Sequence, residues 1–222
     1  MSCFTLEISG ALALFTRPEF KVERMSYEVI TPSAARAIFE AIYWKPEIKW
    51  VVKQIEVLNP IDFTHIQRCE VANIASTKKH EIIAEDFRQL RSSVVLRDVR
   101  YRVSAELKLN DKCLIVNAEL RGKELAKHNA IFLRRAMRGQ CFTQPYLGCR
   151  EFACRWNLVS VNEQKLLVDS NIHYVSPIAV TKDLGRMFYD MDFTNPDNPQ
   201  PLFFEAKMIE GVVKILDFNH SH

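Results

Sequence analysis

The chain has 222 residues, of which 48% are hydrophobic and 26% charged, and this composition excludes a disordered chain and predicts one large domain or one domain with an appendage. The net charge of +3 and the pI near 8.5 are too mild to indicate nucleic-acid binding, so that function has to be argued from where the cations lie. The six cysteines form no CxxC pair, which argues against a structural zinc site.

The first predicted elements are a strand and a helix. Phe4, Leu6 and Ile8 alternate with polar residues, and this period of two predicts a strand with one buried face. Thr31 and Pro32 then have the residue types of an N-cap and of a first helical position, and a helix-favouring run follows them. We expect a helix over residues 32–44.

A β-hairpin is predicted next, because residues 48–58 and 62–73 are rich in β-branched residues on both sides of a short turn. The polar residues 77–91 predict a helical or irregular interlude, and the β pattern resumes over residues 92–109. Residues 110–121 fit either another strand or the lead-in to the next helix.

A second helix is predicted over residues 124–138, because apolar residues recur on one face at spacings of four, three and four. The face that is expected to pack consists of Ala126, Ala130, Leu133 and Met137. At 100° per residue, three cations fall together on the opposite side and two further residues lie beside them. These are Lys127, Arg134 and Arg138, with His128 and Arg135 beside them.

Gly139 stands where a helix C-cap belongs, and residues 149–159 predict a strand after it. This completes the order β-α-β-β-α-β of a ferredoxin-like fold, so the predicted fold class is α+β. After about Trp156 the chain changes to short apolar runs separated by Asn, Pro and Gly turns. We therefore expect a ferredoxin-like domain over residues 1–156 and a small, mainly antiparallel β-sheet domain over residues 157–222.

The start of the chain does not have the pattern of a secretory signal, since Glu7 interrupts its first apolar stretch and no basic segment precedes it. No apolar run approaches the length needed to span a membrane, so no membrane partner is expected. The scattered cysteines fit the reducing cytoplasm, which is the expected location.

Residues 127–150 form a basic segment that contains no Asp or Glu. Like charge of this density is normally tolerated where an anion shares the site, and phosphate is the anion that arginine clusters meet most often. The segment therefore predicts binding of a polyanion. Its cations are Lys127, Arg134, Arg135, Arg138 and Arg150.

Lys127 and His128 stand next to each other at the start of this segment, an arrangement that on spacing alone is more often a solvated pair than a catalytic one. A third group, Tyr43, ends the first helix, which in a ferredoxin-like fold packs on the same side of the sheet as the second helix. A phenol, an ammonium and an imidazole that converge suit RNA cleavage without a metal, to a 2′,3′-cyclic phosphate and a 5′-hydroxyl. DNA is not a substrate for this chemistry, because it lacks the 2′-hydroxyl.

A second group of cations, Arg17, Lys21 and Arg24, is interleaved with two phenylalanines, as on a nucleic-acid surface. A loop closed by ion pairs with Glu19 and Glu23 explains the same pattern equally well. Both interpretations stay open.

Three further residues carry weaker signals. Gly148 allows a backbone to approach a phosphate closely, or simply forms a turn. Asp190 and Asp192 alternate on one strand face, and two carboxylates alone are more often a solvated edge than a metal site. No metal site and no cofactor are therefore predicted.

Four blocks of sequence resemble one known family, in the right order and over most of the chain. They are ALFTRPEFKVERMSYEVITPSAARAIFEAIYWKP, RSSVVLRDVRYRV, RGQCFTQPYLGCREF and LGRMFYDMDF. The chain resembles the CRISPR-associated Cas-five family and, within it, the type I-C (Dvulg, or d) branch. It departs from that branch at Ala37, where a Gly is usual, and at Arg186, where an LGWM-like motif is common.

The resemblance implies a RAMP-superfamily protein with a ferredoxin-like (RRM-like) N-terminal domain and a small C-terminal β-sheet domain. It implies a metal-independent endoribonuclease that cuts precursor CRISPR RNA at the base of the repeat hairpin. The product crRNA then stays bound by its 5′ handle to the protein, as a subunit of the Cascade complex beside the backbone and large subunits. The alternative within the same family is a non-catalytic subunit that binds the crRNA 5′ handle.

The branch uses a Tyr at the end of the first helix and an adjacent Lys-His pair ahead of the second, which correspond to Tyr43, Lys127 and His128. His128 is expected to be the principal acid/base, Lys127 to stabilise charge on the phosphate and Tyr43 to assist at the 2′-hydroxyl. Which of His128 and Tyr43 is the base stays open. The residues expected to grip the RNA backbone are Arg134, Arg135, Arg138 and Arg150.

Overall fold

The computed structural model describes residues 2–20, 23–72, 83–110, 118–161, 164–165 and 175–216. Its strands are β1 (Cys3–Ala13), β2 (Arg24–Met25), β3 (Ile48–Val57), β4 (Phe63–Val71), β5 (Arg88–Leu109), β6 (Arg155–Val161), β7 (Gln164–Lys165), β8 (Lys182–Asp192), β9 (Gln200–Ile209) and β10 (Val212–Lys214). Its helices are α1 (Pro32–Ile42), α2 (Ala118–Met137) and the short 3-10 helix η1 (Ala84–Phe87). The described strands form one 10-stranded sheet in the order β7-β6-β1-β5-β3-β10-β9-β8, and β2 and β4 also pair with β5.

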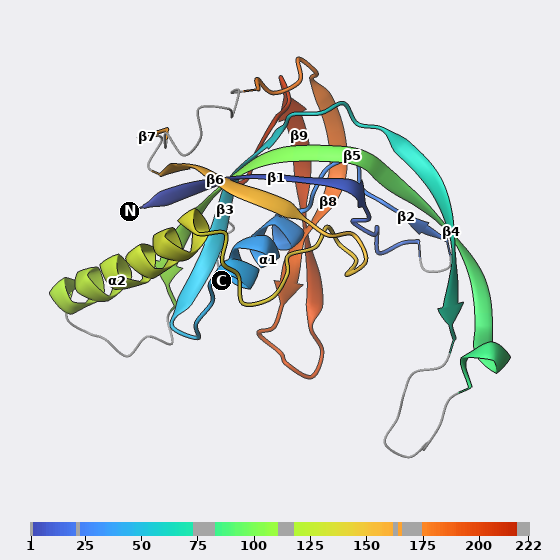
Figure 1. The fold of residues 1–222 in the computed structure, drawn as a ribbon, viewed down its shortest axis with the longest axis horizontal. Coiled ribbons are helices and arrows are strands. Elements are labelled where there is room, and N and C mark those ends of the chain that lie inside the picture. The colour runs from blue at the N-terminus through green and yellow to red at the C-terminus, as the bar shows by residue number, and fades with distance from the viewer. Residues whose placement is uncertain are drawn as a thin grey trace.

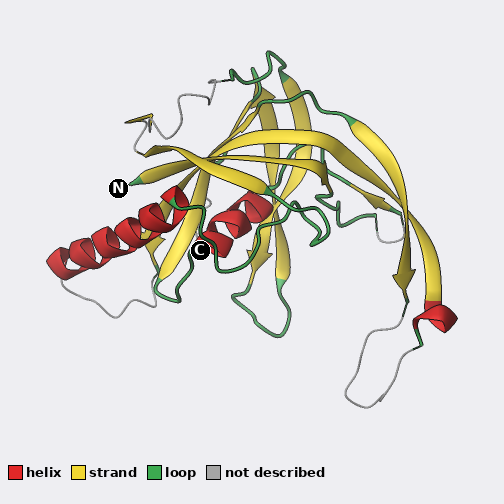
Figure 2. Ribbon diagram, viewed as in Figure 1, coloured by secondary structure: helices red, strands yellow, loops and turns green. Residues whose placement is uncertain are grey.

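Four neighbouring strands of this sheet, β6-β1-β5-β3, have the strand order of a ferredoxin-like fold. Their pairings are all antiparallel, and α1 and α2 lie in the two connections between strands where the predicted order places helices. Figures 1 and 2 show both helices on the same side of these strands. The predicted α+β, ferredoxin-like fold class is therefore confirmed.

Aromatic side chains hold the two helices against the sheet and against each other. The ring centroid of Trp50 on β3 lies 4.5 Å from that of Phe132 on α2 and 5.0 Å from that of Phe39 on α1. Phe4 on β1 lies 4.8 Å from Phe132, and all four side chains are buried. Each such pair contributes about 0.5–1.5 kcal/mol beyond its buried area. This cluster places the end of α1 opposite the middle of α2.

The first strand and the first helix are confirmed. Phe4, Leu6 and Ile8 are buried in β1, and the Thr31 hydroxyl accepts a hydrogen bond from the Ala34 N–H at 3.3 Å as the N-cap of α1. The helix ends at Ile42, two residues before the predicted end, because Tyr43 turns to an extended backbone with φ −155° and ψ 120°.

The predicted C-cap of α2 is confirmed at Gly139, which has φ +63°. The Gln140 N–H donates to the Arg135 carbonyl at 3.0 Å and the Gly139 N–H to the Ala136 carbonyl at 3.3 Å, the two bonds of a Schellman motif. Residues 118–121, which the sequence left open, belong to α2, and residues 111–117 lie outside the described part. The strand predicted over residues 149–159 begins only at Arg155.

Of the face of α2 that was predicted to pack, Leu133 lies partly buried against the core, and the prediction was wrong for the other three residues. The buried residues are His128, Phe132 and Ala136, while Met137 is 54% exposed and Ala126 and Ala130 are exposed too. The large ring of Phe132 decides the orientation, since it buries far more apolar area in the aromatic cluster than the alanines of the predicted face offer. His128, one turn before Phe132, is carried inside with it.

The predicted hairpin was also wrong, although both of its strands exist. β3 pairs with residues 101–109 of β5, and β4 pairs with residues 88–96 of the same strand. Both pairings are antiparallel, so β3 and β4 follow each other in one direction along β5 and the chain does not reverse between them. The 22-residue β5 is long enough for both partners, and Figure 1 shows its first half and β4 as an arm that leaves the body of the sheet.

The last described strands continue the same sheet. β8 and β9 form an antiparallel pair, and β10 pairs with β9 on one side and with β3 on the other. β6 spans the position of the predicted boundary between residues 156 and 157. The division into domains over residues 1–156 and 157–222 stays a prediction.

Candidate active site

Tyr43 and His128 meet in the gap between the end of α1 and the middle of α2. The Tyr43 hydroxyl lies 2.7 Å from Nδ1 of His128, and the two side chains belong to residues that are only 2% and 4% exposed. The Tyr43 carbonyl accepts a hydrogen bond from the indole N–H of Trp50 at 2.9 Å. Trp50 of the aromatic cluster therefore holds the backbone of Tyr43, while the Tyr43 hydroxyl contacts the imidazole of His128.

Glu124 joins Lys127 and His128 through a single carboxylate oxygen. Its Oε1 accepts a hydrogen bond from Nζ of Lys127 at 2.7 Å and lies 3.3 Å from Nε2 of His128. The Lys127 side chain is 61% exposed, so the ammonium lies at the surface directly above the buried imidazole. Tyr43, His128, Lys127 and Glu124 thus form one continuous polar group, which is called the Tyr43–Glu124 cluster below.

Burial and neighbouring charge set the protonation of this cluster. Burial lowers the pKa of His128, and the Glu124 carboxylate opposes that effect by favouring the imidazolium. Burial likewise raises the pKa of Tyr43, against the cations of Arg135 and Lys127. A carboxylate that faces Nε2 favours a proton on that nitrogen, so Nδ1 is the acceptor for the Tyr43 hydroxyl in the neutral ring.

The hydrogen bond between Glu124 and Lys127 also keeps both partners charged. It raises the pKa of Lys127 and lowers the pKa of Glu124. The cluster therefore combines a fixed cation, a fixed anion and a neutral imidazole whose proton can move. Those are the parts needed for acid–base chemistry beside a charged substrate.

Glu124 was missed by the sequence analysis, because the basic segment was taken to start at Lys127 and the residues before it were not considered. The signal was present in the spacing, since Glu124 precedes Lys127 by three residues and His128 by four, and side chains at those spacings are neighbours on a helix.

The arginines of the basic segment have different surroundings. The guanidinium of Arg135 donates to the Ile42 carbonyl at 3.0 Å and lies 5.1 Å from the centre of the Tyr43 ring. It caps the end of α1 and holds Tyr43 from the side. Arg134, Arg138 and Arg150 are exposed.

The cations of the N-terminal group are engaged elsewhere. Arg17 lies 4.8 Å from the centre of the Tyr27 ring and 3.7 Å from Glu19, and Arg24 makes two hydrogen bonds to Glu70 at 2.7 and 3.0 Å. Lys21 lies outside the described residues. Figure 1 shows β2 near the arm of β4 and β5, away from α2, so Arg24 on β2 does not join the Tyr43–Glu124 cluster, and neither does Arg17, which contacts Tyr27 and Glu19.

Gly148 is explained by packing against the neighbouring backbone. It has φ +85°, and a Cβ at this position would stand 1.9 Å from the Leu14 carbonyl oxygen. Only glycine permits this approach. The turn interpretation is sufficient for Gly148.

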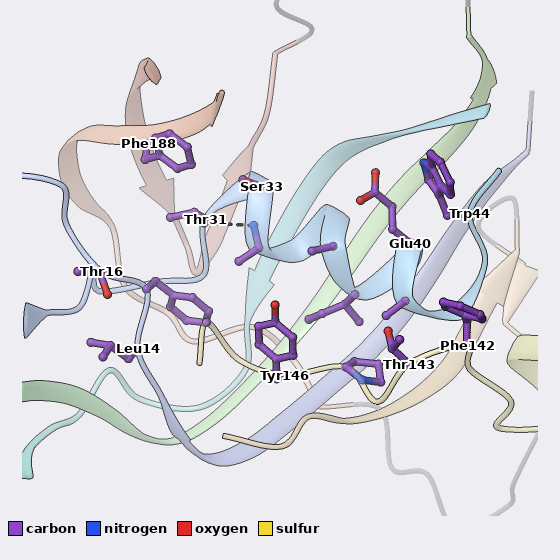
Figure 3. Close-up of a pocket in the computed structure, with 17 residues that line it drawn as sticks. Leu14, Thr16, Thr31, Ser33, Glu40, Trp44, Phe142, Thr143, Tyr146 and Phe188 are labelled. Carbon is purple, nitrogen blue, oxygen red and sulfur yellow. Dashed lines mark hydrogen bonds between the residues drawn. The ribbon is translucent and has the colours of Figure 1, made fainter. Parts of the chain in front are cut away.

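A groove lies beside the cluster, on the outer face of α1 (Figure 3). It has a volume of about 600 Å³ and runs between α1 and the connection of residues 142–148. The Phe142 N–H donates to the Ala41 carbonyl at 2.8 Å and ties this connection to the helix. Trp44, Phe142 and Tyr146 line the groove and are 54%, 84% and 43% exposed. Trp44, which follows Tyr43 directly in the sequence, is one of its lining residues.

The described residues contain no group of three or more His, Cys, Asp or Glu side chains arranged to hold a metal ion. Asp190, weighed above as a metal ligand, instead accepts a hydrogen bond from Arg36 at 2.8 Å. Within the same part of the chain, no helix is long and apolar enough to cross a membrane.

Comparison with known proteins decides the family. The sequence profile of the Cas5 family, described as CRISPR-associated protein (Cas_Cas5), matches residues 3–215. The chain belongs to this family. The resemblance seen in the sequence blocks is thereby confirmed, and the fold described above is that of a Cas5 protein.

Two relatives share the full length of this Cas5 chain. One, from Mannheimia succiniciproducens, is 40% identical over 225 residues that cover 96% of this chain and 94% of the relative. The other, from Thermus thermophilus, is 35% identical over 232 residues that cover 97% and 92%. Both are named CRISPR pre-crRNA endoribonuclease Cas5d.

Two solved structures are also similar to this Cas5 chain. A CRISPR-associated protein has a TM-score of 0.67 at 25% identity, over 99% of this chain and 95% of the other. A protein of Streptococcus mutans has a TM-score of 0.65 at 26% identity, over 97% and 94%. The described fold is therefore shared with proteins outside the closely related sequences.

Proposed function

We propose that this Cas5 protein is a metal-independent endoribonuclease that cleaves precursor CRISPR RNA at the base of the repeat hairpin. Its two full-length relatives carry pre-crRNA endoribonuclease activity in their names. The observation that carries the proposal is the 2.7 Å contact between Tyr43 and His128, with the Lys127 ammonium held next to the same imidazole.

In the proposed reaction the 2′-oxygen attacks the neighbouring phosphorus, the bond from phosphorus to O5′ breaks, and a 2′,3′-cyclic phosphate and a 5′-hydroxyl form. The 2′-hydroxyl proton goes to a base and the 5′-oxygen receives a proton from an acid. We assign this acid/base work to Nε2 of His128, because Nδ1 is held by Tyr43. In the ring tautomer whose proton lies on Nδ1 and points at the Tyr43 oxygen, Nε2 takes the 2′-hydroxyl proton, and the imidazolium then gives a proton from Nε2 to the 5′-oxygen. Lys127 stabilises the charge that builds up on the phosphate.

Tyr43 has a positioning role in this proposal. Its hydroxyl is directed at the imidazole and the residue is buried, which supports a role in orienting His128 rather than one at the 2′-hydroxyl. This replaces the role that the sequence analysis gave it. The choice of base then falls on His128.

The exposed arginines Arg134, Arg138 and Arg150 supply the proposed grip on the RNA backbone, since their guanidinium groups are open to a phosphate. Arg135 acts through Tyr43 and the end of α1. Arg17 and Arg24 are part of the proposal only as secondary contacts, because carboxylates already accompany them.

The groove on α1 is proposed to take unpaired bases next to the cleavage site. The described residues that line it include three exposed aromatic rings and the carboxylate of Glu40, and neither Lys nor Arg, which suits flat, uncharged bases better than phosphates. The lining residue Trp44 directly follows Tyr43 in the chain, which supports a groove that serves the same bound strand.

After cleavage the protein is proposed to keep the 5′ handle of the crRNA and to assemble with the backbone and large subunits of a type I-C Cascade complex. The family assignment supports a CRISPR partner. Because its RNA substrate is made in the cytoplasm, we place the protein there.

Cleavage of the repeat RNA in EDTA tests the proposed activity. The RNA is the repeat transcribed from the CRISPR array beside the gene, and the expected products end in a 2′,3′-cyclic phosphate and a 5′-hydroxyl. We expect His128→Gln and Lys127→Ala each to lower the cleavage rate by about 100-fold or more, as the loss of an acid/base or of a charge-stabilising group does.

Lys123→Ala is the matched control for Lys127→Ala, because Lys123 lies one turn earlier on α2 and pairs with Glu119 at 2.7 Å. It is expected to cleave like the unchanged protein. Lys127 is exposed, so its replacement tests the chemistry without disturbing the core. Undiminished cleavage in both active-site variants would sink the assignment.

A second function, binding of the 5′ handle without cleavage, is favoured by one observation. Both ring nitrogens of His128 are covered in this structure, Nδ1 by Tyr43 and Nε2 by Glu124. Tight binding of the repeat RNA with no cleavage in any buffer supports this candidate. A gene for a Cas-six nuclease beside this one points the same way.

A further inference from the structure

Nε2 of the buried His128 imidazole has an unusual environment. Nε2 is buried and has no hydrogen-bond partner among the described residues, although the Glu124 oxygen lies 3.3 Å away. A buried polar atom of this kind is unusual, because it has given up water without gaining a full hydrogen bond. Among the described residues the Glu124 carboxylate is the charged group that faces Nε2, so a ligand that binds Nε2 has to replace it.

The oxygen that covers Nε2 is also the acceptor for Lys127. One negatively charged oxygen thus lies between an ammonium at 2.7 Å and an imidazole nitrogen at 3.3 Å. Carboxylate and phosphate oxygens are equivalent in this respect, since both accept charge-assisted hydrogen bonds from Lys and His. A phosphoryl oxygen in the position of Oε1 of Glu124 can therefore make the same contacts with Lys127 and His128, and this position is called the phosphate seat below.

Glu124 is able to leave this place without a change in the fold. Its side chain is 29% exposed, it lies on the surface of α2, and a rotation about its side-chain bonds carries the carboxylate into water. From the connection between α1 and β3, Lys45 and Glu47 also act on His128, with opposite signs. Lys127 already donates to the carboxylate oxygen, so it is the cation placed to attract an incoming anion.

We propose that Glu124 occupies the seat of the scissile phosphate in the RNA-free protein, and that an RNA phosphodiester displaces it and takes over Lys127 and Nε2 of His128. This inference rests on the proposed function for the identity of the ligand. It relates the buried His128 to a catalytic one, because the phosphate reaches Nε2 by replacing the carboxylate that faces it.

Glu124→Gln tests the proposal by removing the charge of the occupant while keeping its size. The matched control is Glu119→Gln, which makes the same change of charge on the same helix, at an exposed residue paired with Lys123. Affinity is measured by fluorescence anisotropy with repeat RNA that carries a single 2′-deoxy nucleotide at the cleavage position, so that the RNA is not cut. We expect Glu124→Gln to bind about three- to tenfold more tightly than the unchanged protein, as loss of a competing surface charge allows.

Glu119→Gln is expected to change the affinity by less than about twofold. An equal gain in both variants overturns the proposal, since only the overall charge would then matter, and so does a Glu124→Gln protein that binds no better than the unchanged one. With cleavable RNA the gain is expected to lower KM. A fall in kcat at unchanged affinity also overturns it, because Glu124 would then remain beside His128 in the complex.

The affinity measurement does not depend on turnover. An inert unchanged protein contradicts the nuclease proposal, while the comparison of Glu124→Gln with Glu119→Gln still decides whether Glu124 holds a phosphate seat. The two proposals therefore fail separately.

Discussion

His128 owes its properties to the large ring that follows it on α2. Phe132 has to reach the aromatic cluster of Phe4, Phe39 and Trp50, and the residue four positions earlier is drawn inside with it. The imidazole then needs polar partners in a buried place, and Tyr43 and Glu124 are the ones that the structure supplies. The packing of Phe132 therefore determines both the burial of His128 and the polar groups that surround its imidazole.

The pH dependence of stability follows from the same burial. The folded protein lowers the pKa of His128 below its ordinary value of about 6.5, so the unfolded chain binds the proton more readily. Stability from this group is complete above the unfolded pKa and is lost as the pH falls through about 6.5 towards the folded pKa. We expect the free energy of unfolding, measured with urea between pH 8 and pH 5, to decline less in His128→Gln than in the unchanged protein.

His65→Gln is the control for this measurement, since His65 is exposed on β4. Its decline is expected to match that of the unchanged protein. A His128→Gln protein whose decline also matches would show that His128 has the same proton affinity in the folded and unfolded states.

Most of what could be predicted about the site came from the chemical types of its residues. Tyr43, Lys127 and His128 were singled out because their groups suit metal-free RNA cleavage, and the structure places Tyr43 in contact with His128. Glu124 was overlooked because charged residues were considered only after Lys127, and not at the preceding positions that lie beside Lys127 and His128 on the helix surface. Whether these residues react with RNA stays a prediction.

Among the elements, α1 and the connection of residues 142–148 act together. The helix exposes small side chains such as Ala34, Ala37 and Ala41 to the groove, and the connection opposes them with aromatic rings. Figure 3 shows Trp44 and Phe142 at one end of this groove and Phe188 at the other. Exposed rings around a concave surface are typical of a binding site.

Phe142→Ala tests the proposed place for unpaired bases. Stacking of one base on an aromatic ring is worth about 1–3 kcal/mol, so the affinity for uncleavable repeat RNA is expected to fall by about 5- to 100-fold. The slope of affinity against salt concentration is expected to stay the same, because no phosphate contact is removed.

Phe87→Ala is the control, since Phe87 is an exposed phenylalanine in η1, at the far end of the β4–β5 arm. It is expected to bind RNA like the unchanged protein. Equal affinities for Phe142→Ala and Phe87→Ala would rule out stacking in the groove, and a partner protein would become the better occupant.

The errors at this scale have one physical origin. Local patterns identified β3, β4 and α2, but partners and faces are chosen by contacts between distant parts of the chain. The hairpin prediction was wrong because β3 and β4 both pair with the same long edge of β5. The prediction for the face of α2 was mostly wrong because burying the ring of Phe132 removes more apolar area from water than burying the alanines. Local signals with a fixed mechanism, such as Thr31 at the N-cap and Gly139 at the C-cap, were confirmed.

At the scale of the whole molecule, one hydrophobic core runs through both predicted domains. Phe4 of β1, Phe132 of α2 and Val213 of β10 belong to the same cluster of buried residues. The pairing of β10 with β3 adds backbone hydrogen bonds to this continuity. The two parts therefore share both their sheet and their interior.

We expect the chain to unfold in a single transition, with a calorimetric enthalpy close to the van't Hoff enthalpy. Val213→Ala opens a cavity in β10 and is expected to cost about 2 kcal/mol, which lowers the Tm by about 4 °C or more for a chain of this size. Differential scanning calorimetry of both proteins provides the measurement. Two transitions, of which only one responds to Val213→Ala, would instead indicate independent domains.

β5 sets the registers of the sheet on both of its sides. It pairs with β1 along one edge and with β3 and β4 along the other, and Arg102 in its middle pairs with both Glu7 and Glu56. A slip of one residue would turn every side chain of β5 to the opposite face and separate these charges. The surface on which α1 and α2 pack is thus complete only once β5 has aligned with partners from distant parts of the sequence. The contact between Tyr43 and His128 therefore depends on the register of β5, although neither residue belongs to that strand.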